Sequence, residues 1–362
     1  MYFLLILPSL ALFFTVLNFF TMRTVKPLTK SPDNFQSVSL LLPMRNEESN
    51  AADVLTSVLN QKLLTSPEIL VLDDASSDNT AYIVQQVQSQ NPSHISLYTS
   101  EQLPHGWLGK NWACYQLAEK AAGKYLVFVD ADVRLHPTAV ASSISEMEKL
   151  GLDYFSPHPR EVALTFFEKL IQPLLQWSWM ASVPLRLSEK LKRASMVIAN
   201  GQFFIAKRDA YFSCGGHKHI AGEVLDDLEL ARLLMRHGFK GAVGDASSLA
   251  ECRMYTSSKE LIEGYSKSLW RAFGGLGGTF IACILLLCVG VFPLVFTLTG
   301  SAYGFIGYCL TSISIAISAA KTKSSFLAST LHPISFLLLL FLILRSNILH
   351  TQGKLQWKAR EI

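Results

Sequence analysis

The chain has 362 residues, and its 32 Lys and Arg against 28 Asp and Glu give a formal net charge of +4. This charge is too small to indicate a nucleic-acid-binding surface. Half of the residues are hydrophobic and only 17% are charged, against about 25% in soluble globular domains, so part of the chain is expected to lie in a membrane. The six cysteines form no Cys-x-x-Cys pair, which argues against a disulfide framework or a zinc site and favours a reducing compartment.

The first predicted element is an apolar helix over Tyr2–Met22, which is uncharged over a length that can cross the hydrocarbon core of a bilayer. Positive charges follow this tract at Arg23, Lys26 and Lys30, whereas a cleaved signal peptide carries them before its apolar run. We therefore expect residues 1–22 to be a transmembrane anchor and the residues after it to be cytoplasmic.

Residues 23–278 are predicted to form one large cytoplasmic domain in which strands alternate with helices. The predicted strands cover 38–42, 69–72, 95–98 and 125–129, and the predicted helices cover 47–61, 76–90 and 111–121. This alternation predicts an α/β fold with a parallel sheet and right-handed crossovers. Pro43 is expected to end the first strand, and Gly238 is a natural C-cap for a further helix that begins near Leu225.

Acidic residues follow two of these strands. Asp73 and Asp74 close the second strand, and Asp130-Ala131-Asp132 closes the fourth. Ligands of open α/β sheets bind beyond the carboxyl ends of the strands. Because Mg²⁺ usually takes one or two protein carboxylates and completes its shell with phosphate oxygens and water, the Asp-x-Asp sequence predicts a metal–diphosphate site. A solvated turn is the alternative, and Asp74, with no basic residue next to it in the sequence, favours the metal–nucleotide interpretation.

The helix near Leu225 opens with a second acidic run that contains Asp226 and Asp227. Acidic residues in the first turn of a helix can simply complement the helix dipole. Alternatively, one of the two carboxylates faces the active cleft and deprotonates an attacking hydroxyl as a general base. The helix by itself leaves both interpretations open.

A long apolar segment, Ala163–Val183, lies inside the predicted domain but is interrupted by Pro173. It is predicted as an interfacial helix with Trp177 and Trp179 at the depth of the lipid headgroups. A buried core helix is the alternative.

Residues 279–350 are predicted as membrane helices, in the three apolar tracts 279–299, 303–320 and 331–350. Three full crossings would place the basic tail, residues 351–362, outside the cell, against the positive-inside rule. One tract is therefore expected not to cross fully, and 303–320, which glycines and serines interrupt, is the weakest. The expected location is the cytoplasmic membrane, with several spans and the domain facing the cytoplasm.

Four motifs carry a resemblance to a known family. VSLLLPMRNEE (38–48), ILVLDDASSDNT (69–80), YLVFVDADV (125–133) and LDDLELARLLMRHG (225–238) occur in the order and spacing of the family-two inverting glycosyltransferases with the A-type, Rossmann-like nucleotide-sugar-binding fold. GWLGKNWACYQLA (106–118), CGGHK (214–218), CRMY (252–255) and the closing residues 357–360 are similar to the membrane-bound diaponeurosporenoate glycosyltransferases. The chlorobactene and hopene-associated glycosyltransferases are similar too.

The resemblance implies roles for individual residues. Asp74 would bind the uracil ring, Asp130 would contact the ribose or the sugar, and Asp132 would ligate Mn²⁺ or Mg²⁺. Asp227 would be the base, with Asp226 as the alternative. Further implied contacts are Pro43, Glu47 and Lys110 for the donor, Asp130 as a second metal ligand, and Asn200, Gly201, Gln202, Trp270 and Arg271 for the acceptor.

Alternatives stay open for three of these features. Lys110 can be a surface lysine at a helix start, and Asn200–Gln202, expected to end a strand, can be a plain turn. His217 is either a metal ligand or, more often for a lone histidine beside glycines, a hydrogen-bonded loop residue.

The implied function is transfer of a single sugar from a nucleotide sugar, expected to be a UDP-hexose, to a carotenoid or other isoprenoid acid or alcohol in the membrane. A hopanoid, a polyprenyl phosphate or a glycerolipid is the alternative acceptor. The Gln-x-x-Arg-Trp motif of processive synthases is absent from 266–271, which favours single transfer. Haloacid-dehalogenase-like phosphatases need a Gly-Asp-x-x-x-Asp sequence for their metal, and after Gly244-Asp245 the last aspartate of this pattern is missing, so this class is disfavoured. A non-catalytic scaffold is disfavoured because every expected carboxylate is present.

Overall fold

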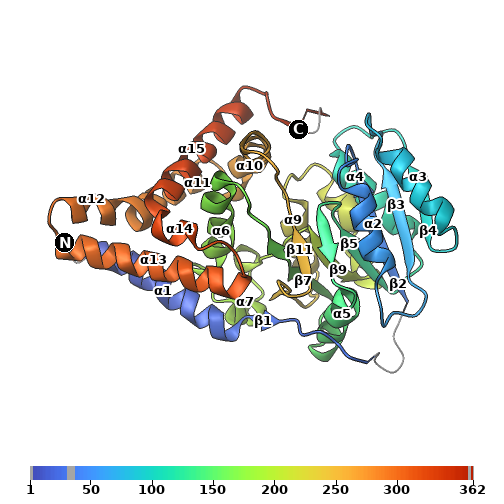
Figure 1. Cartoon of the computed structure of the whole chain (residues 1–362), viewed down its shortest axis with the longest axis horizontal. Coiled ribbons are helices and arrows are strands. Elements are labelled where there is room, and N and C mark those ends of the chain that lie inside the picture. The colour runs from blue at the N-terminus through green and yellow to red at the C-terminus, as the bar shows by residue number, and fades with distance from the viewer. Residues whose placement is uncertain (1–2, 31–36, 358–359, 362) are drawn as a thin grey trace. The chain divides into compact units, whose positions relative to one another are not determined.

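The computed structural model describes residues 3–30, 37–357 and 360–361, with the side chains beyond residue 355 left undescribed. Contacts divide the chain into two compact units (Figure 1). The sheet unit comprises residues 23–160 and 189–252, and the helical unit comprises 1–22, 161–188 and 253–362. Residues 161–188 therefore pack with the helical unit, although they lie within the 23–278 predicted as the cytoplasmic domain.

The sheet unit is built on one eight-stranded sheet with the order β1-β10-β7-β9-β5-β2-β3-β4. Its strands are β1 (Arg23–Thr24), β2 (Val38–Met44), β3 (Glu68–Asp73), β4 (Ile95–Thr99), β5 (Tyr125–Val129), β7 (Tyr154–His158), β9 (Phe203–Lys207) and β10 (Gly241–Asp245). A smaller sheet contains β6 (Val133–Leu135), β8 (Arg160–Glu161) and β11 (Ala250–Cys252). Strands such as β5 are buried along their whole length, which explains why they read as unbroken apolar runs.

The prediction of a wholly parallel sheet is wrong at one strand. β9 runs antiparallel to both of its neighbours, β5 and β7, and Val129 at the end of β5 pairs with Phe203 at the start of β9. Asn200–Gln202 thus precedes a strand instead of ending one. Because β9 is reversed, this turn still lies at the carboxyl edge of the parallel strands, beside Asp130.

Helices cover the sheet and bury its apolar side chains. They are α2 (Ala51–Leu59), α3 (Thr80–Gln90), α4 (Gly109–Lys120), α5 (Ala139–Lys149), α8 (Arg208–Ser213), α9 (Asp226–Arg236) and the short η1 (Ala194–Met196) and η2 (Gly216–Ile220), with α7 (Leu185–Leu191) on the segment that links the two units. Leu117 of α4 and Leu234 of α9 belong to one core cluster with Leu41 and Phe128 of the sheet. This shared core fixes the starts of α4 and α9, where the predicted site residues lie.

Three predicted boundaries differ from the structure. β2 continues through Pro43 to Met44, since Pro43 lies past the stretch paired with β5 and its missing N–H costs no bond there. α3 starts at Thr80 and not at Ser76, whose hydroxyl instead accepts from the Asn46 backbone N–H at 3.0 Å. The helix predicted from residue 47 begins at Ala51. Gly238 follows α9 with a φ of +91°, as predicted for a C-cap glycine.

The helical unit contains four helices long and apolar enough to cross a membrane, among the residues described: Leu4–Thr21, Leu276–Leu298, Ala302–Thr322 and His332–Thr351. Its elements are α1 (Phe3–Thr21), α6 (Phe166–Met180), α10 (Ser258–Ala272), α11 (Leu276–Leu286), the π-helical η3 (Leu287–Val291), α12 (Phe292–Leu298), α13 (Ala302–Thr322), α14 (Leu327–Thr330), α15 (His332–Thr351), β12 (Gln356–Trp357) and β13 (Arg360–Glu361). Both α6 tryptophans are buried, and Trp177 donates to Ser314 Oγ at 2.8 Å. This is the packing of a core helix and not the headgroup contact expected for Trp177 and Trp179, although Phe166 and Phe167 are exposed.

Candidate active site

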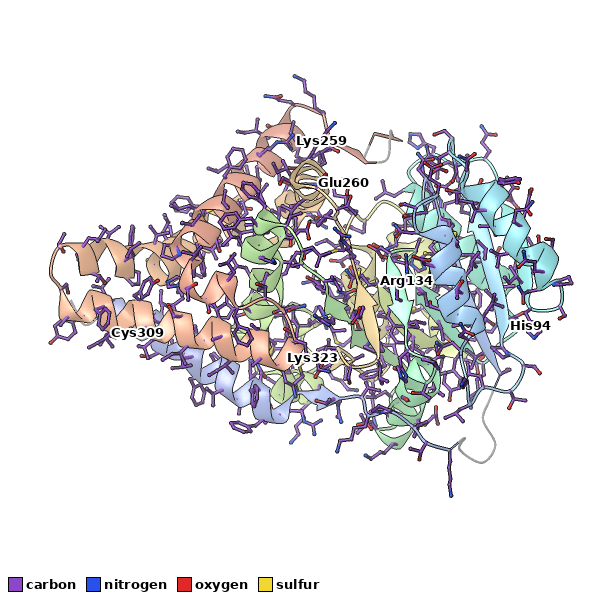
Figure 2. All side chains as sticks on the ribbon, in the orientation of Figure 1. His94, Arg134, Lys259, Glu260, Cys309 and Lys323 are labelled. Carbon is purple, nitrogen blue, oxygen red and sulfur yellow. The ribbon has the colours of Figure 1, made fainter. Side chains whose placement is uncertain are left out.

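The turn after β5 carries Asp130 and Asp132. The Asp130 backbone N–H donates to the Gln202 carbonyl at 3.0 Å, and the Val133 N–H donates to the Asp130 carbonyl at 3.1 Å. Arg134, labelled in Figure 2, donates to the carbonyls of Ala131 at 2.8 Å and Val133 at 3.0 Å. These bonds hold the Asp-Ala-Asp segment in one conformation at the edge of the sheet.

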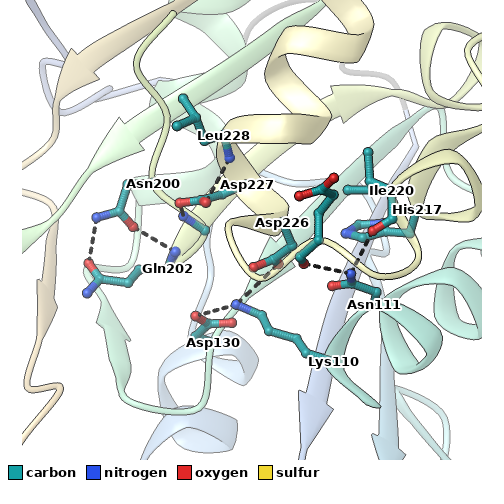
Figure 3. Close-up of polar contacts among 12 residues, drawn as sticks. Lys110, Asn111, Asp130, Asn200, Gln202, His217, Ile220, Asp226, Asp227 and Leu228 are labelled. Atoms are coloured by element: carbon teal, nitrogen blue, oxygen red, sulfur yellow. Dashed lines mark hydrogen bonds and ion pairs between the residues drawn. The ribbon is translucent and has the colours of Figure 1, made fainter. Parts of the chain in front are cut away.

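Lys110, in the first turn of α4, lies between two carboxylates. Its Nζ is 3.0 Å from Asp130 Oδ2 and 3.5 Å from Asp226 Oδ2 (Figure 3). Loss of solvation opposes ionisation, but the charges of Asp130 and Asp226 outweigh it and raise the pKa of Lys110 well above its ordinary value. The Lys110 side chain remains 39% exposed, so an anionic ligand can reach this cation. Lys110 is thus part of the acidic site and not a lysine on a plain surface.

Asp227, beside Asp226 in the first turn of α9, is held by backbone donors. Its Oδ2 accepts from the Gly201 N–H and its Oδ1 from the Leu228 N–H, both at 2.7 Å (Figure 3). Burial, followed by the charge of Asp226, raises the pKa of Asp227 to about 6. A carboxylate with this pKa is ionised at neutral pH and is a better proton acceptor than an ordinary aspartate.

Asp132 is a buried carboxylate beside other acidic groups, which is the character of a metal ligand. Burial, followed by the charges of Asp130 and Glu47, raises the pKa of Asp132 to about 6, against a hydrogen bond with Cys252. Its Oδ1 is enclosed and has no hydrogen-bond partner among the residues described. In the described part of the chain, no group of three or more His, Cys, Asp or Glu side chains could hold a metal ion by itself. Asp132 and Asp130 as the nearest carboxylates fit a cation that takes one or two protein ligands and completes its shell with diphosphate oxygens and water.

Glu47 lies close to this cluster because two loops are bonded together. The Glu47 backbone N–H donates to Thr80 Oγ1 at 2.7 Å, which joins the loop after β2 to the start of α3. Asn50 donates to Glu47 Oε2 at 3.0 Å and accepts from Arg134 at 3.0 Å. The structure thus brings Glu47 toward Asp132, as a predicted donor contact near the metal–diphosphate position.

Asp74 is buried directly after β3, two strands from β5, and Pro43 on β2 pairs with Leu72, two residues before it. The sequence showed no basic residue near Asp74, and here the structure differs. Arg45, from the end of β2, donates to the carbonyls of Asp74 at 2.6 Å and Ala75 at 3.0 Å. Neighbouring strand ends bring this guanidinium close although it is 29 residues away in sequence.

Other predicted residues are placed differently. His217 is buried, and its Nδ1 lies 2.8 Å from Tyr211 Oη, which is the hydrogen-bonded alternative and not a metal ligand. Trp270 and Arg271 belong to α10 of the helical unit, and the Trp270 ring stacks on His350 with centroids 3.5 Å apart. Their role in acceptor binding stays a prediction.

The sequence did not single out Arg134 or His158, both of which contact this region. Arg134 follows Asp132 by two residues, and a basic residue this close to an Asp-x-Asp pair was the available signal. His158 ends the buried strand β7, so the rule that drew attention to Asp130 at a strand end applies to it as well.

Comparison with known proteins relates part of the chain to a described family. Residues 39–212 match the family described as glycosyl transferase family 2. The chain carries a glycosyl transferase family 2 domain. The matched residues include Asp74, Lys110, Asp130 and Asp132, and end before Asp226 and Asp227.

Two relatives resemble the chain over most of its length. The 4,4'-diaponeurosporenoate glycosyltransferase of Staphylococcus haemolyticus (strain JCSC1435) is 26% identical over 260 residues, which cover 70% of this chain and 67% of that protein. The 4,4'-diaponeurosporenoate glycosyltransferase of Staphylococcus aureus (strain MRSA252) is 24% identical over 352 residues, or 91% of this chain and 88% of that protein. The chain is a glycosyltransferase, and this assignment replaces the phosphatase interpretation.

A solved structure has the same fold. The mannosyltransferase PcManGT from Pyrobaculum calidifontis, in complex with GDP-Man and Mn2+, matches with a TM-score of 0.56 at 15% identity, over 96% of this chain and 100% of that chain. The predicted A-type glycosyltransferase fold with additional membrane helices is confirmed.

Proposed function

We propose that the chain transfers one sugar from a nucleotide-sugar donor to a lipid acceptor in the membrane, with inversion at the anomeric carbon. The observation that carries this proposal is the cation of Lys110 between Asp130 and Asp226, with Asp227 next to it on α9. One side of this arrangement suits a diphosphate with its cation, and the other side suits a proton acceptor. Both are needed for direct displacement of a nucleoside diphosphate by an acceptor oxygen.

The donor half of the site would consist of Pro43, Glu47, Asp74, Asp130 and Lys110. Asp132 and Asp130 would hold Mn²⁺ or Mg²⁺, whose charge would stabilise the departing diphosphate. The partnerless Oδ1 of Asp132 supports this role. Lys110 would contribute a fixed positive charge to the phosphates when the donor displaces it from a carboxylate.

The acceptor half centres on Asp227. Its carboxylate would take the proton of an acceptor hydroxyl as that oxygen attacks the anomeric carbon on the face opposite the leaving group. For an acceptor that is already a carboxylate, Asp227 would orient the attacking oxygen without a net proton transfer. The Asp226 carboxylate is paired with Lys110 and is therefore less available to accept a proton. This pairing supports Asp227 as the base.

The acceptor class is proposed from two observations. Both relatives described above are named for a carotenoid acid, 4,4'-diaponeurosporenoate, and the chain contains four helices that can cross a membrane. A carotenoid or other isoprenoid acid or alcohol is the preferred acceptor. A hopanoid, a polyprenyl phosphate or a glycerolipid is the alternative.

A reconstitution assay tests the proposal. Membranes containing the full chain would be incubated with Mn²⁺, one donor (UDP-glucose, UDP-galactose or GDP-mannose) and one acceptor (a carotenoid carboxylic acid, polyprenyl phosphate, a hopanoid alcohol or diacylglycerol). We expect the carotenoid acid to gain the mass of one hexosyl residue from a UDP donor. NMR of the product should show a β linkage. Transfer only to one of the other lipids would change the acceptor, an α linkage would exclude inversion, and hydrolysis without transfer to any lipid would contradict the proposal.

A further inference from the structure

The turn Asn200–Gln202 is fixed by hydrogen bonds from β7. The Asn200 backbone N–H donates to Ser156 Oγ at 2.8 Å, and the Ser156 hydroxyl donates back to the Asn200 carbonyl at 3.2 Å. Ser156 is 1% exposed, so water does not compete for these bonds. A single buried hydroxyl therefore holds both backbone polar groups of Asn200.

The Asn200 side chain is fixed as well, through His158. His158 Nδ1 lies 2.9 Å from the Pro159 carbonyl, which can only accept, so Nδ1 carries the ring proton. Burial lowers the pKa of His158, so the ring is neutral at neutral pH and its Nε2 is an acceptor. That Nε2 lies 3.4 Å from Asn200 Nδ2. Asn200 Oδ1 accepts from the Gln202 N–H at 2.7 Å, so a flipped amide would lose both contacts (Figure 3).

The same turn holds two carboxylate residues of the proposed reaction. Gly201 N–H donates to Asp227 Oδ2 at 2.7 Å, and the Gln202 carbonyl accepts from the Asp130 N–H at 3.0 Å. The space beside Gly201 is tight, because a Cβ there would lie 3.2 Å from Asp227 Cβ and 3.4 Å from Lys110 Nζ. A small shift of the turn must therefore move or release Asp227.

We propose that Ser156 and His158 are positioning residues for transfer, which act on Asp227 through the Asn200–Gln202 turn and its Gly201 N–H. The turn then belongs to the positioning of the base, in addition to any contact with the acceptor. This inference rests on the proposed role of Asp227 as the base. The β5–β9 pairing at Val129 and Phe203 flanks the Gln202–Asp130 contact, so loss of Ser156 should disturb Asp227 more than Asp130.

A double-mutant cycle in the full chain tests the proposal. Ser156→Ala is expected to lower kcat for transfer about tenfold, since small misplacements of a reacting group are costly. Donor affinity by calorimetry should change less than about twofold. In the Asp227→Asn background, Ser156→Ala should cause no further loss of kcat, because its effect passes through the absent carboxylate. Ser143→Ala, at a buried serine of α5 whose hydroxyl has no partner, is the matched control and should leave kcat unchanged.

A second pair of variants guards against misfolding. His158→Leu should reproduce the loss of kcat, and His158→Gln, which can again offer an acceptor to Asn200, should recover most of it. Losses that multiply with Asp227→Asn, or equal losses in His158→Leu and His158→Gln, would overturn the inference. Wild-type activity of Asp227→Asn by itself would instead refute the proposed role of Asp227 as the base, so the two failures can be told apart.

Discussion

Asp226 and Asp227 are neighbours in sequence, yet their side chains have different partners. Asp226 is paired with Lys110 at 3.5 Å, whereas Asp227 accepts from the Gly201 backbone at 2.7 Å. Successive residues of a helix point about 100° apart, so only one of them can face a given partner. This difference separates the two candidates for the base.

Replacing each aspartate by asparagine tests the assignment. With an alcohol acceptor, Asp227→Asn is expected to lower kcat by about 10²-fold or more, because a lost general base is worth that much, while donor binding by calorimetry stays intact. Asp226→Asn is expected to weaken donor binding, because Asp226 is one of the two carboxylates that hold Lys110 in position for the donor phosphates. If Asp226→Asn abolished turnover and Asp227→Asn did not, the base would be the preceding residue; if both stayed active, the proposed mechanism would fail.

The pKa of about 6 for Asp227 predicts a pH dependence of transfer to an alcohol acceptor. Only the ionised carboxylate accepts a proton, so kcat should be constant above this pKa and fall tenfold per pH unit below it. An ordinary aspartate, with a pKa near 3.9, would give a flat profile down to about pH 5. The measurement is kcat at saturating donor and acceptor from pH 4.5 to 8, with unfolding checked at each pH.

Asp132→Ala is predicted to abolish transfer, because the diphosphate loses its cation as the leaving group departs. Binding of Mn²⁺ in the presence of the nucleoside diphosphate, followed by paramagnetic resonance, should weaken in parallel. Asp209→Ala, at an exposed aspartate of α8, is the control and should behave as wild type. Full activity of Asp132→Ala at saturating Mn²⁺ would refute the assignment.

Among the elements, the start of α4 is tied to the segment that leads into α9 by one side chain. The buried Asn111 amide donates to the carbonyls of Ile220 at 2.8 Å, Ala221 at 2.9 Å and Glu223 at 3.0 Å. Lys110 precedes this amide, and Asp226 follows the bonded segment by three residues. Asn111 therefore sets the distance at which the lysine and the carboxylate meet.

Asn111→Ala should consequently destabilise the sheet unit by about 2 kcal/mol, since buried carbonyls lose their donor. Thermal unfolding of the purified chain in detergent should show a lower midpoint. Steady-state kinetics should show a larger KM for the donor. Asn91→Ala is the control, because that amide donates only within its own helix end, to Val87 at 3.0 Å. An unchanged midpoint for Asn111→Ala would contradict this account.

At the scale of the whole molecule, contacts within the helical unit bear on which helices cross. α13 lies beside α1, with Ser314 Oγ 2.9 Å from Thr15 Oγ1. Because α1 is the predicted transmembrane anchor, we expect α13 to cross the membrane as well. The C-terminal half of α15 is instead bonded to charged α10: Arg345 donates to Ser266 Oγ at 2.6 Å and Trp270 N–H to Ser346 Oγ at 2.9 Å. This argues that α15, and not the 303–320 tract, is the one that stops short.

By length and composition α15 is a candidate span, but its apolar part before Arg345, from Ile334 to Leu344, is about 16 Å long, against roughly 30 Å of hydrocarbon. The exposed large apolar side chains of α15 form a single stripe of Ile334, Leu337, Phe341, Leu344 and Ile348, which suits a helix lying in the interface. We predict that α15 does not cross and that the tail after Thr351 is cytoplasmic.

Fusions at residue 362 test this prediction. A green fluorescent protein fusion should fluoresce and an alkaline phosphatase fusion should be inactive, as expected for a cytoplasmic end. The matched control is a fusion after Gly300, between α12 and α13, which should show the opposite pattern. Active phosphatase at residue 362 would mean that α15 crosses.

Local sequence determined much of this protein. The apolar runs of β2, β3 and β5 and the aspartates at their ends could be placed because a buried strand and a strand-end carboxylate each leave a short-range pattern. The four apolar helices could be placed for the same reason, since length and hydrophobicity decide whether a helix can span. Lys358 of the basic tail was included in the positive-inside argument but lies outside the described residues.

Tertiary structure decided what depends on groups far apart in the chain. The reversal of β9, the pairing of Lys110 with Asp226 and the contact of His158 with Asn200 join residues at least 40 positions apart. A buried apolar run in the sequence looks the same for a parallel and an antiparallel strand, so it does not indicate strand direction. The hydrogen-bond partner of a side chain is set by the packing of elements and not by neighbours in sequence. For these reasons the sequence could identify the aspartates, but only the fold could assign each carboxylate its partner.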